Sequence, residues 1–259
     1  MDQKVRPRGQ RLLIKLTIGF VVFALLVSCA ALKDEELQKE ESTSIYLQLG
    51  VRYMELGKLQ IAKENLDIAL KKAPDDSSVH NALAFLYEKL GNEPQASMHY
   101  KKALALAPDD WSVQNNFGRL MCQQRDFKQG MRLLSQASST PLNEKQWLAL
   151  TNAGLCQQAM NNNSQAKAYF EQALILNKLY APALVAMQKM SFQEGDYLAA
   201  QTYLQRYLEG SVYTSSVLWV AIQTELALNH PDLVKQYQQL LVEKFPLSTE
   251  AKQIESVLH

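Results

Sequence analysis

The chain has 259 residues, of which 47% are apolar and 20% are charged, a composition typical of a folded domain and unlike that of a disordered chain. Its 10 glycines and 8 prolines are few for this length, which disfavours a loop-rich β-sandwich and favours long helices with short connections. A net charge of +1 gives no reason to bind nucleic acid, and three cysteines are too few for a disulfide scaffold or a four-ligand zinc site.

The first 28 residues are predicted to be a secretory signal peptide. Basic side chains dominate residues 1–15, and residues 16–27 then form a run without a charged side chain. As a helix this run would be about 18 Å long, which is short for a hydrocarbon core of about 30 Å. A basic segment followed by a short apolar run is typical of a signal peptide. An uncleaved membrane anchor is the alternative.

The end of this apolar run, Leu26-Val27-Ser28-Cys29, resembles the lipobox of bacterial lipoproteins. The resemblance implies that Cys29 carries the lipid and becomes the new N-terminus, although a chance cysteine is the alternative. Several acyl chains would anchor the protein stably. Because Ala30 rather than Asp follows, the usual sorting rule implies the outer membrane, with the protein facing the periplasm. Residues 29–42, with five acidic and two basic side chains, are predicted to be an acidic tether, compatible with a frayed extension of the first helix.

From residue 43 onward the sequence repeats with a period of 34. Aligning the chain on Pro74, Pro108 and Pro246 gives the windows 43–76, 77–110, 111–146, 147–180, 181–214 and 215–248. Residues 249–259 are predicted to supply a C-terminal capping segment. Within each window, one position falls between two predicted helices and reads Gly57, Gly91, Arg125, Asn161, Gly195 and Asn229. Gly and Asn tolerate the left-handed conformation just past a helix end, so this position predicts a helix–turn–helix unit.

The pattern resembles the tetratricopeptide repeat. The first window carries the signature residues Tyr46, Leu49, Gly50, Tyr53, Ala62, Leu66, Ala69 and Pro74, whose small members let two antiparallel helices approach closely. The resemblance implies an all-α fold, a right-handed α-α superhelix of about six repeats, each covering the apolar face of its neighbour. The last two repeats depart from the signature, because Gln188 and Ile222 replace a small residue. We expect one elongated domain with a continuous core.

Cys122 and Cys156 both fall on first helices, in the third and fourth repeats. First helices of adjacent repeats are neighbours, so the two sulfur atoms could come within bonding distance. An exported protein would also meet an oxidising compartment. The sequence therefore favours a disulfide, with two separate buried thiols as the alternative.

The tetratricopeptide resemblance also implies that the first helices line a concave groove. In the first three repeats its positions carry Leu47, Val51, Met54, Asn81, Phe85, Glu88, Asn115 and Arg119. The apolar members suit a docked peptide or amphipathic segment, and Asn115 with Arg119 could hold its backbone. The alternative is that some of these side chains pack internally. No basic cluster lines the groove, so the carboxylate clamp of chaperone-tail binders is not expected.

The sequence carries no catalytic motif. It has no glycine-rich phosphate loop, no nucleophile elbow and no paired histidines at metal-binding spacing. The acidic pairs Asp75-Asp76 and Asp109-Asp110 precede helix starts, where a capping carboxylate is expected. His80 occupies an aromatic position of its repeat and is interpreted as a packing residue. We therefore expect no catalytic residue, metal, cofactor or small-molecule substrate.

An exported lipoprotein of tetratricopeptide repeats resembles the type IV pilus biogenesis lipoproteins, which act as pilotins for the secretin, the outer-membrane channel of the pilus. The likeness rests on this layout and on the segments 46–50, 81–84 and 115–118. It implies that the chain binds the secretin subunit and promotes its outer-membrane localisation and multimerisation. The alternative is a scaffold lipoprotein of β-barrel assembly or cell-wall synthesis. An enzyme is a third hypothesis, but the repeats leave no residues for a catalytic domain.

Overall fold

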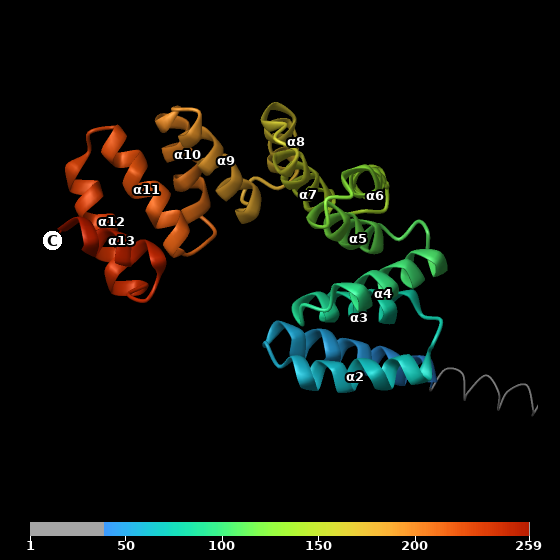
Figure 1. Cartoon of the computed structure of the whole chain (residues 1–259). Coiled ribbons are helices and arrows are strands. Elements are labelled where there is room, and N and C mark those ends of the chain that lie inside the picture. Colours follow the sequence, from blue (N-terminus) through green and yellow to red (C-terminus); the bar gives the residue numbers. More distant parts are fainter. Residues whose placement is uncertain (1–38, 259) are drawn as a thin grey trace, which may run out of the picture. The chain divides into compact units, whose positions relative to one another are not determined.

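The computed structural model describes residues 39–258, and every regular element in this range is an α-helix (Figure 1). The expected all-α fold class is therefore confirmed. The predicted signal peptide, Cys29 and most of the predicted tether lie outside the described residues. None of the described helices combines the length and the apolar character needed to cross a membrane.

The helices follow one another in antiparallel pairs joined by short turns. The chain is helical over residues 39–55 and then forms α2 (Leu59–Lys72), α3 (Ser77–Lys89), α4 (Glu93–Leu106), α5 (Trp111–Gln123), α6 (Phe127–Ser139), α7 (Gln146–Ala159), α8 (Asn163–Leu176), α9 (Ala181–Gln193), α10 (Tyr197–Leu208), α11 (Ser215–Ala227), α12 (Pro231–Lys244) and α13 (Thr249–Leu258). The two helices within a pair pack most extensively, as in α3 with α4 and α5 with α6.

Small residues set the spacing within each pair. A Cβ atom added to Gly118 of α5 would lie 2.9 Å from Leu134 Cγ and 3.0 Å from the Gly130 carbonyl oxygen of α6. In the next pair, a Cβ on Gly154 would lie 2.5 Å from the ring of Phe170. Both distances are too short for real atoms, so a side chain at either glycine would push the helix axes apart.

The turn between paired helices uses the left-handed conformation that the sequence predicts. The residue at this position has φ of 70° at Gly57, 70° at Gly91, 65° at Arg125, 62° at Asn161, 80° at Gly195 and 59° at Asn229.

Two aspartates cap the N-terminal ends of first helices: Asp76 caps α3 and Asp110 caps α5. Their carboxylates accept hydrogen bonds from backbone N–H groups two residues on, at 2.7 and 2.8 Å, which confirms the capping interpretation.

The chain divides into two compact units, and each unit has its own core. The N-terminal unit is Met1–Leu106, of which residues 39–106 are described, and the C-terminal unit is Ala107–His259. The expectation of one elongated domain with a continuous core stays a prediction, and each unit is described by itself. A repeat in a tandem array contacts only its neighbours, so the array can separate at a junction between two repeats.

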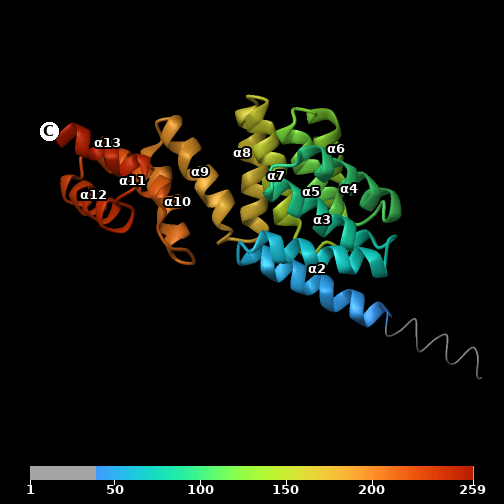
Figure 2. The same cartoon turned by 60° about the horizontal axis from the view of Figure 1, so that its bottom comes forward.

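The N-terminal unit buries Leu66, Leu83 and Leu86 between its helices. The C-terminal unit contains a cluster around Phe170, Leu184 and Met187 and a second cluster in its last three helices. In both views α12 and α13 lie beside α11 (Figures 1 and 2). Ala251 and Ile254 of α13 are buried there, so this last helix covers apolar surface that α11 and α12 would otherwise expose.

Candidate functional site

The N-terminal unit places three of the predicted groove residues at its surface. Val51 is 38% exposed, and Leu47 and Phe85 are half-buried against the core. The ammonium nitrogen of Lys89 lies 5.0 Å from the centroid of the Phe85 ring, close enough for a cation–π interaction. Together, Leu47, Val51 and Phe85 form an apolar surface with a cation at its edge.

Two other predicted groove residues of this unit, Met54 and Glu88, make contacts between its helices. Met54 is only 4% exposed and packs in the core with Leu66 and Leu83, so it does not line a surface. The reason is geometric: Met54 lies one turn after Gly50, and the face that carries Gly50 points at α2. Glu88 is half-buried and accepts a hydrogen bond from the Tyr100 hydroxyl, which ties α3 to α4. Asn81 is half-buried on α3.

In the C-terminal unit the two predicted polar residues have different surroundings. Asn115 is 7% exposed, and its side-chain oxygen accepts a 2.9 Å hydrogen bond from the Asn152 amide. It therefore connects α5 to α7 rather than presenting a free amide. Arg119 is half-buried and borders a cavity of about 130 Å³, with Gln123, Asn152 and Leu155 among its lining residues. This cavity can hold one small side chain with polar groups at its rim.

A disulfide forms part of the wall of this cavity. Cys122 of α5 and Cys156 of α7 are bonded, with their Cα atoms 5.5 Å apart. Both residues are buried, and Gly130 of α6 leaves the space that the Cys122 sulfur occupies. The bond fixes α5 to α7, and so the positions of Asn115 and Asn152 relative to each other.

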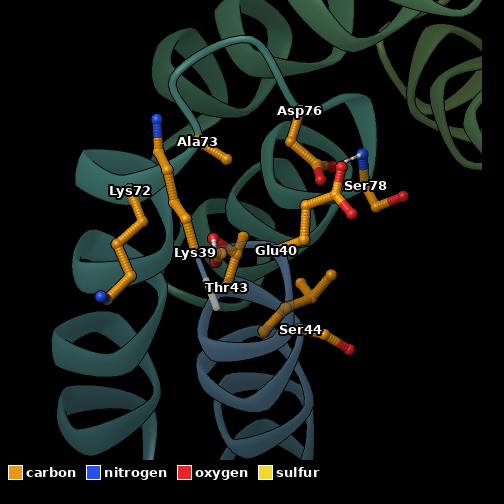
Figure 3. A pocket seen from close by; sticks show the side chains of 9 residues that line it. Lys39, Glu40, Thr43, Ser44, Lys72, Ala73, Asp76 and Ser78 are labelled. Carbon is orange, nitrogen blue, oxygen red and sulfur yellow. Dashed lines mark hydrogen bonds between the residues drawn. The ribbon is translucent and has the colours of Figure 1, made fainter. Parts of the chain in front are cut away.

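A second cavity, of about 510 Å³, lies in the N-terminal unit and was not predicted from the sequence (Figure 3). Its lining includes Lys39, Glu40, Leu47, Lys72 and Asp76. In Figure 3 the two lysine side chains lie on one side and the two carboxylates on the other. The Asp76 carboxylate is already engaged in capping α3. Because Leu47 also lines this cavity, the cavity adjoins the apolar surface formed by Leu47, Val51 and Phe85.

Two buried histidines meet in the core of the N-terminal unit. The Nδ1 atoms of His80 and His99 are 2.9 Å apart, and His80 Nε2 lies 2.9 Å from the Pro74 carbonyl oxygen. If His80 donates to Pro74 through Nε2, neutral His80 accepts from His99 through Nδ1. Burial, and then the neighbouring His80, lower the pKa of His99 to about 4. The structure thus supports a packing role for His80, which completes a polar contact within its repeat.

Two segments of the chain, residues 47–111 and residues 149–178, match models of the tetratricopeptide repeat family. Together with the helical pairs and the left-handed turns, these matches show that the chain contains tetratricopeptide repeats.

Relatives with similar repeats come from type IV pilus systems. The chain is 26% identical to the type IV pilus assembly protein PilF of Pseudomonas aeruginosa, across 94% of this chain and 98% of PilF. A solved structure of Pseudomonas aeruginosa PilF is similar with a TM-score of 0.73 and 27% identity, and covers 85% of this chain and 99% of that one. The crystal structure of PilW, a widely conserved type IV pilus biogenesis factor, has the same fold (TM-score 0.73, 23% identity, 82% and 97% covered).

Proposed function

We propose that this chain is an outer-membrane lipoprotein of type IV pilus biogenesis that acts as a pilotin, binding the secretin subunit and promoting its localisation and multimerisation. The observation that carries the proposal is the similarity to PilF, which extends over 94% of this chain and 98% of PilF. The match thus spans nearly the full length of both proteins, and the proposal takes the role of this chain from that relative.

In this proposal the lipid on Cys29 holds the protein at the outer membrane, and the repeats hold the partner. The Leu47, Val51 and Phe85 surface suits the apolar face of an amphipathic segment, since docked helices bury side chains at regular spacing. In the C-terminal unit, Arg119 and Asn152 supply polar groups for a polypeptide backbone. A bound secretin subunit would travel with the lipoprotein and would be kept from aggregating before it multimerises.

The test is an affinity purification of the full-length lipoprotein from gently solubilised envelopes, with partners identified by mass spectrometry. A secretin as the dominant partner supports the proposal. A β-barrel assembly protein or a cell-wall synthase as the dominant partner would instead identify a scaffold lipoprotein. Replacing Cys29 with Ser should leave helicity unchanged and abolish outer-membrane secretin multimers, and normal multimers in that variant would contradict the pilotin role.

A charge at the apolar surface tests where the partner binds. Val51→Glu should weaken secretin binding about tenfold, because a buried contact is replaced by a charge that must be desolvated. Ile61→Glu is the matched control: Val51 and Ile61 are each 38% exposed in the same unit, and Ile61 is on α2 rather than a first helix. Equal affinities of the two variants, by biolayer interferometry, would place the binding surface elsewhere.

A further inference from the structure

The second helices of two adjacent pairs in the C-terminal unit border a third cavity, here called the outer pocket. It lies along α8 and α10, has a volume of about 520 Å³, and is lined by Glu171, Leu174, Ile175, Lys178, Tyr203 and Arg206. None of these residues belongs to the first helices on which the proposed secretin contacts lie. The outer pocket is therefore a separate site.

The apolar wall of the outer pocket is fixed by the core beneath it. Leu174 is 6% exposed and is a core residue, and Tyr203 packs against the same core cluster. Ile175, in contrast, is 76% exposed. The fold thus holds the shape of the pocket in place, and Ile175 adds apolar surface that a ligand would remove from water.

Charges in the outer pocket are separated by sign. Glu171 lies one helical turn before Ile175, whereas Lys178 follows the C-terminal end of α8. Arg206 is held beside Lys178, because its Nη2 atom donates a 2.9 Å hydrogen bond to the Lys178 carbonyl oxygen. Its guanidinium carbon also lies 5.7 Å from the centroid of the Tyr203 ring, within cation–π distance. The two cations therefore share one end of the pocket.

Both cations can still bind an anion. Within residues 39–258, neither Lys178 nor Arg206 forms a salt bridge with a carboxylate. A guanidinium has five N–H donors, and the Lys178 carbonyl oxygen engages one nitrogen of Arg206. Burial, and then the negative charge of Glu171, raise the pKa of Tyr203, whereas Arg206 and Lys167 lower it, so charges of both signs act on this wall.

We propose that the outer pocket binds a polypeptide segment in which a bulky apolar side chain lies next to a carboxylate. The apolar side chain covers Ile175 and Tyr203, and the carboxylate accepts two hydrogen bonds from the Arg206 guanidinium with Lys178 nearby. Glu171 repels a second acidic group, which sets the direction of the segment. Lys178, Arg206 and Glu171 together give the pocket a net charge of +1, which one carboxylate balances and a phosphate dianion exceeds.

A random peptide library displayed on phage and selected on the full-length chain tests this proposal. We expect enriched peptides that share an apolar residue beside Asp, Glu or the C-terminal carboxylate. Their affinity should fall about tenfold or more for Ile175→Glu and for Arg206→Glu, since a charged hydrogen bond or a buried apolar contact is lost in each case. Lys178→Glu provides the same charge reversal at a side chain that forms no hydrogen bond or salt bridge among residues 39–258.

Two matched controls come from the same unit. Leu198→Glu introduces a carboxylate at Leu198 of α10, which is an apolar residue that is highly exposed (66%), as Ile175 of α8 is. Arg132→Glu reverses a charge on α6, where the Arg132 guanidinium donates a hydrogen bond to Gln136 one turn along the same helix. Circular dichroism establishes that each variant is folded. The proposal is overturned if no such peptide is enriched, or if enriched peptides bind the pocket variants and the controls equally.

Discussion

In the N-terminal unit two histidines meet in the core between α3 and α4, whereas in the C-terminal unit a disulfide joins α5 to α7. The C-terminal unit also buries a carboxylate: Glu225 is 1% exposed, accepts a 2.9 Å hydrogen bond from Gln201 and lies 2.7 Å from His230 Nδ1. The two units share their helix–turn–helix geometry. They differ in the polar and covalent contacts that reinforce it, so acid and reductant should affect them separately.

The largest expected difference comes from removing the disulfide. The bond joins residues separated by 34 positions, and its loss should cost the C-terminal unit about 4 kcal/mol by the loop-entropy model. Trp111, Trp147 and Trp219 all lie in this unit, so tryptophan fluorescence during urea unfolding reports on it alone. The Cys122→Ala/Cys156→Ala variant should unfold at lower urea by this signal.

The N-terminal unit serves as the internal control for that experiment. Hydrogen exchange within residues 39–106 should be unchanged in the double-cysteine variant, because both ends of the bond lie in the C-terminal unit. An unchanged fluorescence midpoint, or equal loosening of both units, would contradict the assignment of the disulfide's effect to the C-terminal unit.

Acid should destabilise the N-terminal unit. His99 has a pKa of about 4 in the folded chain against an ordinary value of 6.5, so between these values the unfolded chain binds more protons. Stability must therefore fall as the pH decreases from 6.5 to 4, by up to about 3 kcal/mol, and then level off. Asp67 opposes this effect by favouring protonated His99, whereas the neighbouring His80 reinforces it.

Hydrogen exchange at several pH values, corrected for intrinsic rates, measures the acid effect in each unit. Peptides from α3 and α4 should lose protection between pH 6.5 and 4 in the natural chain. In His99→Gln, which keeps a hydrogen-bonding group without titrating in this range, that loss should be much smaller. The same pH dependence in both chains would exclude His99 as its cause.

The smallest expected effect concerns a turn. Both turns of the N-terminal unit have glycine at positive φ, whereas the C-terminal unit has Arg125 at φ 65°. A side chain other than glycine is strained in this region, so Arg125→Gly should stabilise the C-terminal unit by about 0.5–1 kcal/mol. The urea midpoint of tryptophan fluorescence checks this, with Arg132→Gly as a control that should be destabilising because it places glycine within α6.

The repeat geometry could be predicted because it depends on local sequence. Small residues at fixed spacing, capping aspartates and the left-handed turn position are each visible in a single window of the sequence. The division into two units could not be predicted, since Ala107–Asp110 reads like any other junction between repeats. The junction at which the two units divide depends on the total packing within the repeats on each side, which cannot be read from any single residue.

The candidate site was predictable only in part. Positions such as Val51 and Phe85 follow from helical periodicity, but Met54 shows that a position shared with groove residues can turn toward the core. The His80–His99 contact escaped prediction because His99 does not occupy a signature position. The outer pocket escaped it as well, since nothing in the sequence distinguishes the exposed Ile175 from its buried neighbour Leu174.

The redox state of Cys122 and Cys156 also reports on the compartment in which the chain has folded. Cys122 and Cys156 are bonded only in an oxidising compartment, because cytosolic thiols are kept reduced. Once closed, the bond is shielded from solvent and should survive cell lysis. If the chain is exported as proposed, alkylating thiols at the moment of lysis and counting the modified cysteines would show which fraction of the chains has left the cytosol, without fractionating the cell or attaching a reporter.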